Sequence, residues 1–119
     1  KLKSNNIEIH VRSVFLQGLL LLNYKKLKGI FSCIREHQKK MHNFFESHGM
    51  TIMEGCLRAV VQNNDIDKII LGCDNVLQLK EIHQTFLDVT NFKKDVNFKE
   101  FMISNKKIIN PGLWKINEI

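Results

Sequence analysis

Proline is almost absent from this 119-residue sequence, and so are long apolar runs. One proline and six glycines are too few for an extended disordered tract. The apolar stretch at residues 14–22 is interrupted by Gln17 and Gly18, whereas a helix that spans a bilayer needs about 20 apolar residues. No signal peptide is visible. We therefore expect a cytoplasmic protein that does not enter a membrane.

Cysteine is also scarce, and its pattern argues against a disulfide scaffold. The three cysteines, Cys33, Cys56 and Cys73, are odd in number and each sits in an apolar run. We expect reduced, buried thiols. Cys33 and His37 are four residues apart and could share a helix face, but two ligands do not make a zinc site. The sequence predicts no metal centre.

The net charge of +6 raises the question of nucleic-acid binding. Residues 1–62 carry ten basic and four acidic side chains, whereas residues 63–119 carry eight of each. The pairs Lys25–Lys26 and Lys39–Lys40 are not interleaved with aromatic residues, as a platform for base stacking would require. We interpret the excess as a solvated face and predict no nucleic-acid partner.

Hydrophobic periodicity predicts alternating strands and helices. Residues 7–16 have the β-branched composition of a strand that is buried on both faces. A helical stripe of Ile34, Met41 and Phe45 follows at residues 33–48, and Thr51 and Glu54 form a capping box for a helix at 51–62.

Residues 66–72 predict a second strand. The next element is a helix at residues 75–87 with a cap from Asp74 or Asn75. Its apolar stripe consists of Val76, Leu79, Ile82, His83 and Phe86. A shorter helix begins near Asn97.

This order of elements predicts a βαβ unit followed by another helix. The two strands are expected to be neighbours and parallel, because such crossovers are nearly always right-handed and parallel. Two strands cannot bury both faces of a parallel sheet. We therefore expect residues 1–119 to form a single partial domain. Because the sequence begins at Lys1 without methionine, we also expect a piece of a longer protein.

Two segments resemble a known enzyme family. VRSVFLQGLLL (11–21) is similar to the seventh strand of aldo/keto reductases, and IDKIILGCDNVLQLKEI (66–82) is similar to the eighth strand and the helix after it. The segments TIMEGCLRAVVQ and INPGLW resemble the intervening helix and the tail. Val14 and Ile82 depart from the family pattern, where many members have proline and asparagine. The resemblance covers residues 5 to 114.

The resemblance implies a fold, a cofactor and a site. The fold would be α/β, the C-terminal part of a TIM barrel with two βα units, and the cofactor would be NADPH rather than NADH. In such barrels the loops after the last two strands commonly bind phosphate, so we expect Gly18 and Gly72 at the carboxyl ends of the two strands. The residues that the resemblance places at the dinucleotide are Ser13, Phe15, Gly18 and Leu20 along the pyrophosphate, and Gly72, Asn75, Gln78 and Glu81 near the adenosine and its 2′-phosphate. Asp74 would repel that phosphate, and Lys80 would offset the repulsion.

The catalytic residues of the family are missing from this chain. Aldo/keto reductases transfer a hydride from the nicotinamide, and a tyrosine tuned by a lysine acts as general acid beside an aspartate and a histidine. The single tyrosine, Tyr24, has no aspartate before it. We therefore assign no catalytic residue and expect this chain alone to be inactive. His10 is expected to be structural, and Arg12 could contact a phosphate or form an ion pair.

The alternative interpretation is a non-catalytic interaction module. A fragment with open sheet edges would bury them by forming an oligomer or by docking to the missing half of a barrel. Val11, Val14, Phe15 and Ile70 would be exposed in a monomer. A third interpretation, a basic nucleic-acid-binding domain, ranks below both. The sequence leaves open the substrate, the choice between NADP and NAD, and the oligomeric state.

Overall fold

A computed structural model describes residues 1–115, and their contacts form two compact units. Residues 1–14 and 53–96 form the sheet unit, and residues 15–52 together with the segment from Asn97 form the helical unit. The sequence had predicted a single partial domain. Every contact discussed below lies within one of the two units.

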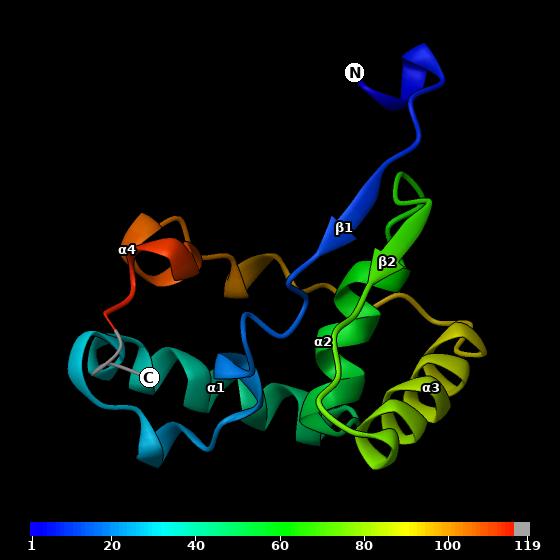
Figure 1. The fold of residues 1–119 in the computed structure, drawn as a ribbon. Coiled ribbons are helices and arrows are strands. Elements are labelled where there is room, and N and C mark those ends of the chain that lie inside the picture. Colours follow the sequence, from blue (N-terminus) through cyan, green and yellow to red (C-terminus); the bar gives the residue numbers. More distant parts are fainter. Residues whose placement is uncertain (116–119) are drawn as a thin grey trace. The chain divides into compact units, whose positions relative to one another are not determined.

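The sheet unit is built on two parallel strands, as the βαβ pattern predicts. β1 (His10–Arg12) pairs with β2 (Lys68–Ile70), and Val11 lies opposite Ile69. The strands run side by side in Figure 1, and β2 leads into α3 (Val76–Thr90). α2 (Ile52–Val61) lies in the crossover, and its residues from Met53 onward belong to this unit. The predicted helices at 51–62 and 75–87 are confirmed.

The first strand is much shorter than predicted and is not buried on both faces. Only three residues pair, and His10 and Arg12 are exposed while Val11 is half-buried. Ser13 has a φ of 62°, in the left-handed region, which ends the extended conformation. Val14 and Phe15 lie beyond the strand, and Val14 is buried rather than exposed. The β-branched run therefore overstates the strand, because residues 7–9 lie before the paired segment and residues 14–16 form a turn.

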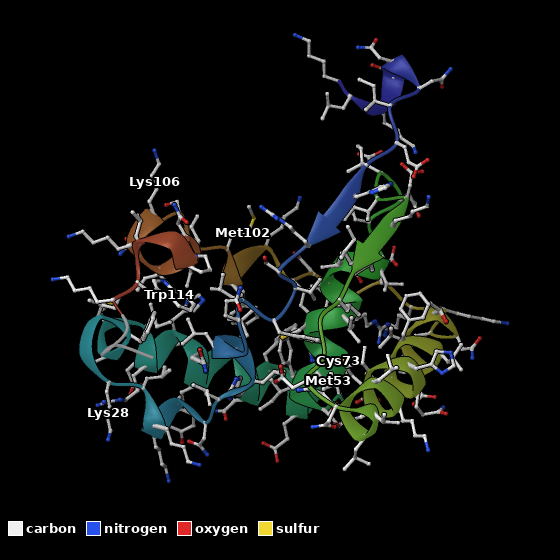
Figure 2. The ribbon with its side chains drawn as sticks, in the orientation of Figure 1. Lys28, Met53, Cys73, Met102, Lys106 and Trp114 are labelled. Carbon is white, nitrogen blue, oxygen red and sulfur yellow. The ribbon has the colours of Figure 1, made fainter. Side chains whose placement is uncertain are left out.

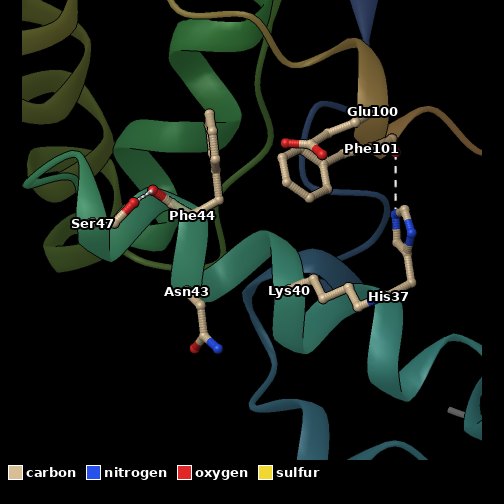
Figure 3. Close-up of a pocket in the computed structure, with 7 residues that line it drawn as sticks. All are labelled: His37, Lys40, Asn43, Phe44, Ser47, Glu100 and Phe101. Carbon is tan, nitrogen blue, oxygen red and sulfur yellow. Dashed lines mark hydrogen bonds between the residues drawn. The ribbon is translucent and has the colours of Figure 1, made fainter.

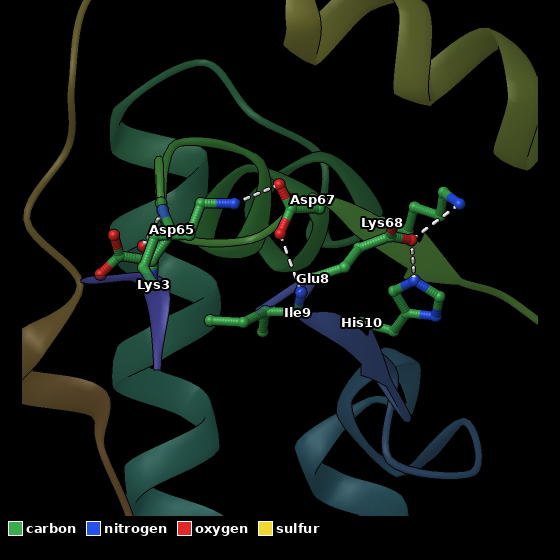
Figure 4. A network of polar contacts seen from close by, with 8 residues as sticks. Lys3, Glu8, Ile9, His10, Asp65, Asp67 and Lys68 are labelled. Atoms are coloured by element: carbon green, nitrogen blue, oxygen red, sulfur yellow. Dashed lines mark hydrogen bonds and ion pairs between the residues drawn. The ribbon is translucent and has the colours of Figure 1, made fainter. Parts of the chain in front are cut away.

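Polar contacts fix the register at the start of the two strands (Figure 4). The Ile9 N–H donates to the Asp67 carboxylate at 2.8 Å, and the Asp67 N–H donates to the Ile9 carbonyl at 2.9 Å. Lys3, followed by the Ile9 N–H, lowers the pKa of Asp67. Glu8 contacts Lys68 at 2.8 Å and also contacts His10. This contact agrees with the structural role expected for His10.

α3 buries a narrower stripe than its sequence predicts. Ile82 and Val89 are buried, but Val76 and Leu79, which belong to the predicted stripe, are 68% and 52% exposed. Buried positions seven residues apart mark a single line along the helix. A two-stranded sheet offers too little surface to cover the first turn of α3 as well.

The helical unit packs α1 (Arg35–Ser47) against short 3-10 segments. Ile34, Met41 and Phe45 are buried, as the predicted stripe requires. The core of the unit consists of Leu19, Leu27, Phe31, Ile34 and Ile108. Trp114, labelled in Figure 2, lies edge-on to Phe31 with ring centroids 4.8 Å apart.

The remaining elements of the helical unit are short. The 3-10 turns before α1 are Leu19–Leu21, Tyr24–Lys26 and Gly29–Ile34. The helix predicted near Asn97 is only a 3-10 turn, Lys99–Phe101. Phe98 and Phe101 are half-buried, and the chain turns extended at Met102. α4 (Lys106–Ile109) and a final 3-10 turn, Pro111–Leu113, complete the described chain.

All three cysteines are free, but only Cys56 is buried. The prediction of buried thiols is wrong for Cys33 and for Cys73, which lies in the open segment between β2 and α3 (Figure 2). Cys33 precedes the buried Ile34 and Cys73 follows the apolar run that ends at Leu71, yet neither cysteine is buried. Burial raises the pKa of the Cys56 thiol to about 12.

We expect two of the three thiols to react with Ellman's reagent in the native protein at pH 8. Cys33 and Cys73 are accessible, whereas Cys56 is both covered and held in the unreactive thiol form. The third thiol should react only after denaturant is added. Equal rates of reaction for all three thiols in the native protein would contradict this assignment.

Candidate functional site

The carboxyl ends of the two strands hold part of the predicted phosphate site. Arg12 pairs with Ile70 in the last position of the ladder, so Ser13 and Leu71 leave the sheet at the same edge. Gly72 follows at once. Gly18 does not lie at the end of β1, as we had predicted, because the strand stops six residues earlier. Ligands in parallel α/β folds commonly bind at this edge.

α3 begins at Val76, four residues after Gly72, and its first turn carries two capping hydrogen bonds. The Asn75 side chain accepts a hydrogen bond from the Gln78 N–H at 2.8 Å. The Gln78 side chain accepts one from the Asp74 N–H at 2.6 Å. Gln78 thus reaches one residue beyond the capping residue, where a standard box would have it contact Asn75 itself. These two hydrogen bonds fix the first turn of α3.

Glu81, the last predicted residue of this group, lies in the second turn of α3. Its side chain is exposed, and its carbonyl accepts a hydrogen bond from the Thr85 hydroxyl at 2.8 Å. Within residues 1–115, no hydrogen bond or ion pair joins its side chain to Asn75 or Gln78. Ser13 and Gly72 therefore lie just beyond the paired strand residues, Asn75 and Gln78 are joined at the start of α3, and Glu81 lies apart from both groups.

The other predicted residues form a tight turn in the helical unit. Leu16, Gln17 and Gly18 have φ values of 48°, 56° and 81°, three left-handed residues in succession, and only the glycine adopts this region without steric cost. The Leu20 N–H donates back to the Phe15 carbonyl at 3.3 Å. Within residues 1–115, the N–H groups of Gln17 and Gly18 have no hydrogen-bond partner. Such turns form concave anion sites.

Two side chains of α1 hold the segment that follows this turn, residues 19–22, and sequence reasoning missed both. Gln38 donates to the carbonyls of Leu19 and Leu22 at 3.0 and 2.7 Å. His42, one helical turn later, contacts the Leu20 carbonyl at 3.0 Å. Strained backbone persists where surrounding contacts fix it. A polar residue at position 38, within the stripe of buried α1 positions, was the available signal.

Gln38 and His42 are both shielded from solvent, Gln38 almost completely and His42 in part. Gln38 is 1% exposed, and its Oε1 has no hydrogen-bond partner among the described residues. Burial lowers the pKa of His42, and its hydrogen bond to Leu20 opposes that shift. Neutral His42 can donate its ring N–H to this carbonyl. The 19–22 segment is therefore anchored to α1 by uncharged side chains near neutral pH.

Tyr24 packs against two side chains of α1 in the helical unit. Its ring lies edge-on to His42 with centroids 6.4 Å apart, and the Lys39 ammonium lies 5.9 Å from its centre. No aspartate belongs to this unit. Within residues 1–115, no group of three metal-ligating side chains comes together. In the same range, no helix has both the length and the apolar character to cross a membrane.

The charge is divided unequally between the units. The helical unit has ten basic and four acidic residues, whereas the sheet unit has eight of each. All of the net charge of +6 therefore belongs to the helical unit.

Comparison of the chain with protein-family models, with curated proteins and with solved structures gives no match. The family likeness consequently depends on the segments quoted above.

Proposed function

We propose that this chain is the C-terminal portion of an NAD(P)H-dependent aldo/keto reductase and that it binds the phosphate side of the cofactor. The barrel would be completed by strands outside this sequence, and the residues for hydride and proton transfer would come from there. The chain would contribute binding and orientation of the dinucleotide, which supply much of the rate in two-substrate reactions.

The observation that carries the proposal is the shared carboxyl edge of β1 and β2, together with the capped start of α3 that follows β2 along the chain. The first N–H groups of a helix have no partner within the helix and carry a partial positive charge. A phosphate suits this position. Ser13 and Gly72 leave the two paired strands at this edge, and Asn75 fixes where the helix begins.

A second feature supports an anion ligand independently. In the turn at Leu16, Gln17 and Gly18, the N–H groups of Gln17 and Gly18 have no hydrogen-bond partner among the described residues. Gln38 and His42 bind carbonyls of the residues that follow this turn, at positions 19, 20 and 22. We assign this turn to the pyrophosphate, in line with the family likeness of residues 11–21.

The isolated chain should bind the adenosine half of the cofactor as well as it binds the whole molecule. In an NMR titration we expect adenosine 2′,5′-bisphosphate and NADPH to bind with similar dissociation constants, of about 1 mM or weaker (roughly −4 kcal/mol). Nicotinamide mononucleotide should not bind, because no residue in this chain is assigned to that end.

The variant that tests the site is Asp74→Asn. Removing an exposed carboxylate beside a helix start should tighten binding of the bisphosphate by about two- to fivefold, equivalent to ~0.3–1 kcal/mol. Asp88→Asn, at the other end of α3, is the matched control and should change nothing. Equal binding of nicotinamide mononucleotide, or no response to Asp74→Asn, would contradict the proposal.

The alternative, an oligomerising interaction module, is favoured by one group of exposed apolar side chains. Ile70, Val76 and Leu77, at the end of β2 and the start of α3, are 55%, 68% and 77% exposed. The two-stranded sheet also leaves both lateral edges unpaired among the described residues. Such a module would bind neither half of the dinucleotide, so the same titration separates the two functions.

A further inference from the structure

A pocket in the helical unit lies outside every residue assigned above. It has a volume of about 530 Å³, within the range of small-molecule sites. His37, Lys40 and Phe44 line it from one face of α1, and Glu100 and Phe101 line it from the 3-10 turn Lys99–Phe101 (Figure 3). Their spacing of three and four residues along α1 explains the shared face.

The pocket has an aromatic wall. The rings of Phe44 and Phe101 are 5.0 Å apart and tilted by 57°, and Phe98 lies edge-on to Phe44 at 6.0 Å. His37 Nε2 lies 3.2 Å from the Phe101 carbonyl, which ties the turn to the helix. Phe44 and Phe101 are both half-buried. A planar apolar group could therefore add to an existing aromatic cluster.

The pocket also carries one charge of each sign. Lys40 and Glu100 are exposed and come from opposite walls, and Figure 3 shows the Glu100 carboxylate on the side of Phe44 and Phe101. Neither forms an ion pair with any residue in the range 1–115. The positive charge of the helical unit as a whole favours approach of a ligand with an anionic group.

From this arrangement we propose that the pocket binds a free α-amino acid with an aromatic side chain. The ligand carboxylate pairs with Lys40, its ammonium group pairs with Glu100, and its ring packs against Phe44 and Phe101. A zwitterion is the smallest ligand that satisfies both charges, and the aromatic wall selects its side chain. The site is separate from the proposed dinucleotide site, and it stands whether or not that function is correct.

The test is a titration of the full chain with L-phenylalanine, followed by NMR. We expect millimolar binding, with the largest shifts at Lys40, Phe44 and Phe101. L-Phenylalaninamide lacks the carboxylate, and 3-phenylpropionate lacks the ammonium group, so each should bind about two- to fivefold more weakly.

Matched variants assign each charge to its partner. Lys40→Gln should weaken L-phenylalanine by a similar factor and remove the difference between the amino acid and its amide. Glu100→Gln should also weaken binding of L-phenylalanine, and it should remove the difference between L-phenylalanine and 3-phenylpropionate. Lys26→Gln and Glu46→Gln, which change exposed charges outside the pocket lining, are the controls.

Two outcomes would overturn the inference. A site with a dissociation constant of about 1 mM is half-saturated at about 1 mM ligand. One contradicting outcome is therefore that the pocket residues show no shifts at about 20 times that concentration. The other is 3-phenylpropionate binding as tightly as L-phenylalanine, which would make the pocket a site for aromatic anions. An unchanged amide spectrum of each variant without ligand shows that its fold is intact.

Discussion

Leu27→Ala should lower the free energy of unfolding of the helical unit by ~2–5 kcal/mol, the range for a buried leucine that leaves a cavity. Leu27 is 2% exposed and packs in the core with Leu19, Phe31 and Ile108. A small protein has only about 5–15 kcal/mol of stability in total. The variant should therefore be close to unfolded at moderate temperature.

Leu22→Ala is the matched control, because it removes the same atoms from the same loop. Leu22 is 44% exposed, and its contact with Gln38 uses the backbone carbonyl, which alanine keeps. The expected change is within about 0.5 kcal/mol. The fluorescence of Trp114, the single tryptophan, reports unfolding because its ring packs on Phe31. Equal urea midpoints for the two variants would contradict the core described here.

The helices and the pairing of the strands were predictable because they depend on local signals. The Asn75 cap and the Gln78 contact start α3 at the expected residue. The stripe of Ile34, Met41 and Phe45 set the face of α1. These signals are spacing and side-chain chemistry within a few residues, which a sequence displays directly.

The errors arose where tertiary context decides. Val14 and Phe15 have the composition of a strand, yet the left-handed residues from Ser13 onward make a turn. Val76 and Leu79 fit an apolar stripe, but no sheet surface covers them. Cys33 and Cys73 lie in apolar runs and remain exposed. The composition of an apolar run does not determine which of its side chains is buried in the folded protein.

The candidate site was predictable only where it coincides with helix and strand ends. Ser13, Gly72 and Asn75 could be placed there from the predicted topology. The contacts of Gln38 and His42 with the 19–22 segment join residues 16 to 22 positions apart. No local pattern encodes such a pair. The pocket around Lys40 and Glu100 was missed for the same reason.

A buried arginine gives the second large expected effect. Arg58 is 4% exposed in α2, its guanidinium lies 3.8 Å from the centre of the Phe92 ring, and it donates to the Lys94 carbonyl. One turn later Gln62 donates to the Val96 carbonyl at 2.6 Å. Together they attach the segment after α3 to α2. Ion-assisted hydrogen bonds contribute about 1.5–3 kcal/mol and cation–π contacts about 0.5–2 kcal/mol.

Arg58→Ala should therefore destabilise the sheet unit by ~2–4 kcal/mol. The thiol of Cys56, buried in the same helix, provides the measurement in a Cys33→Ser, Cys73→Ser background. When opening is fast relative to labelling, the rate follows the open population. Each 1.36 kcal/mol is a factor of ten, so labelling should accelerate about 30-fold or more. Lys93→Ala removes an exposed neighbouring charge and should leave the rate unchanged. If Arg58→Ala labels no faster than Lys93→Ala, the arginine contributes little to holding the 92–96 segment on α2.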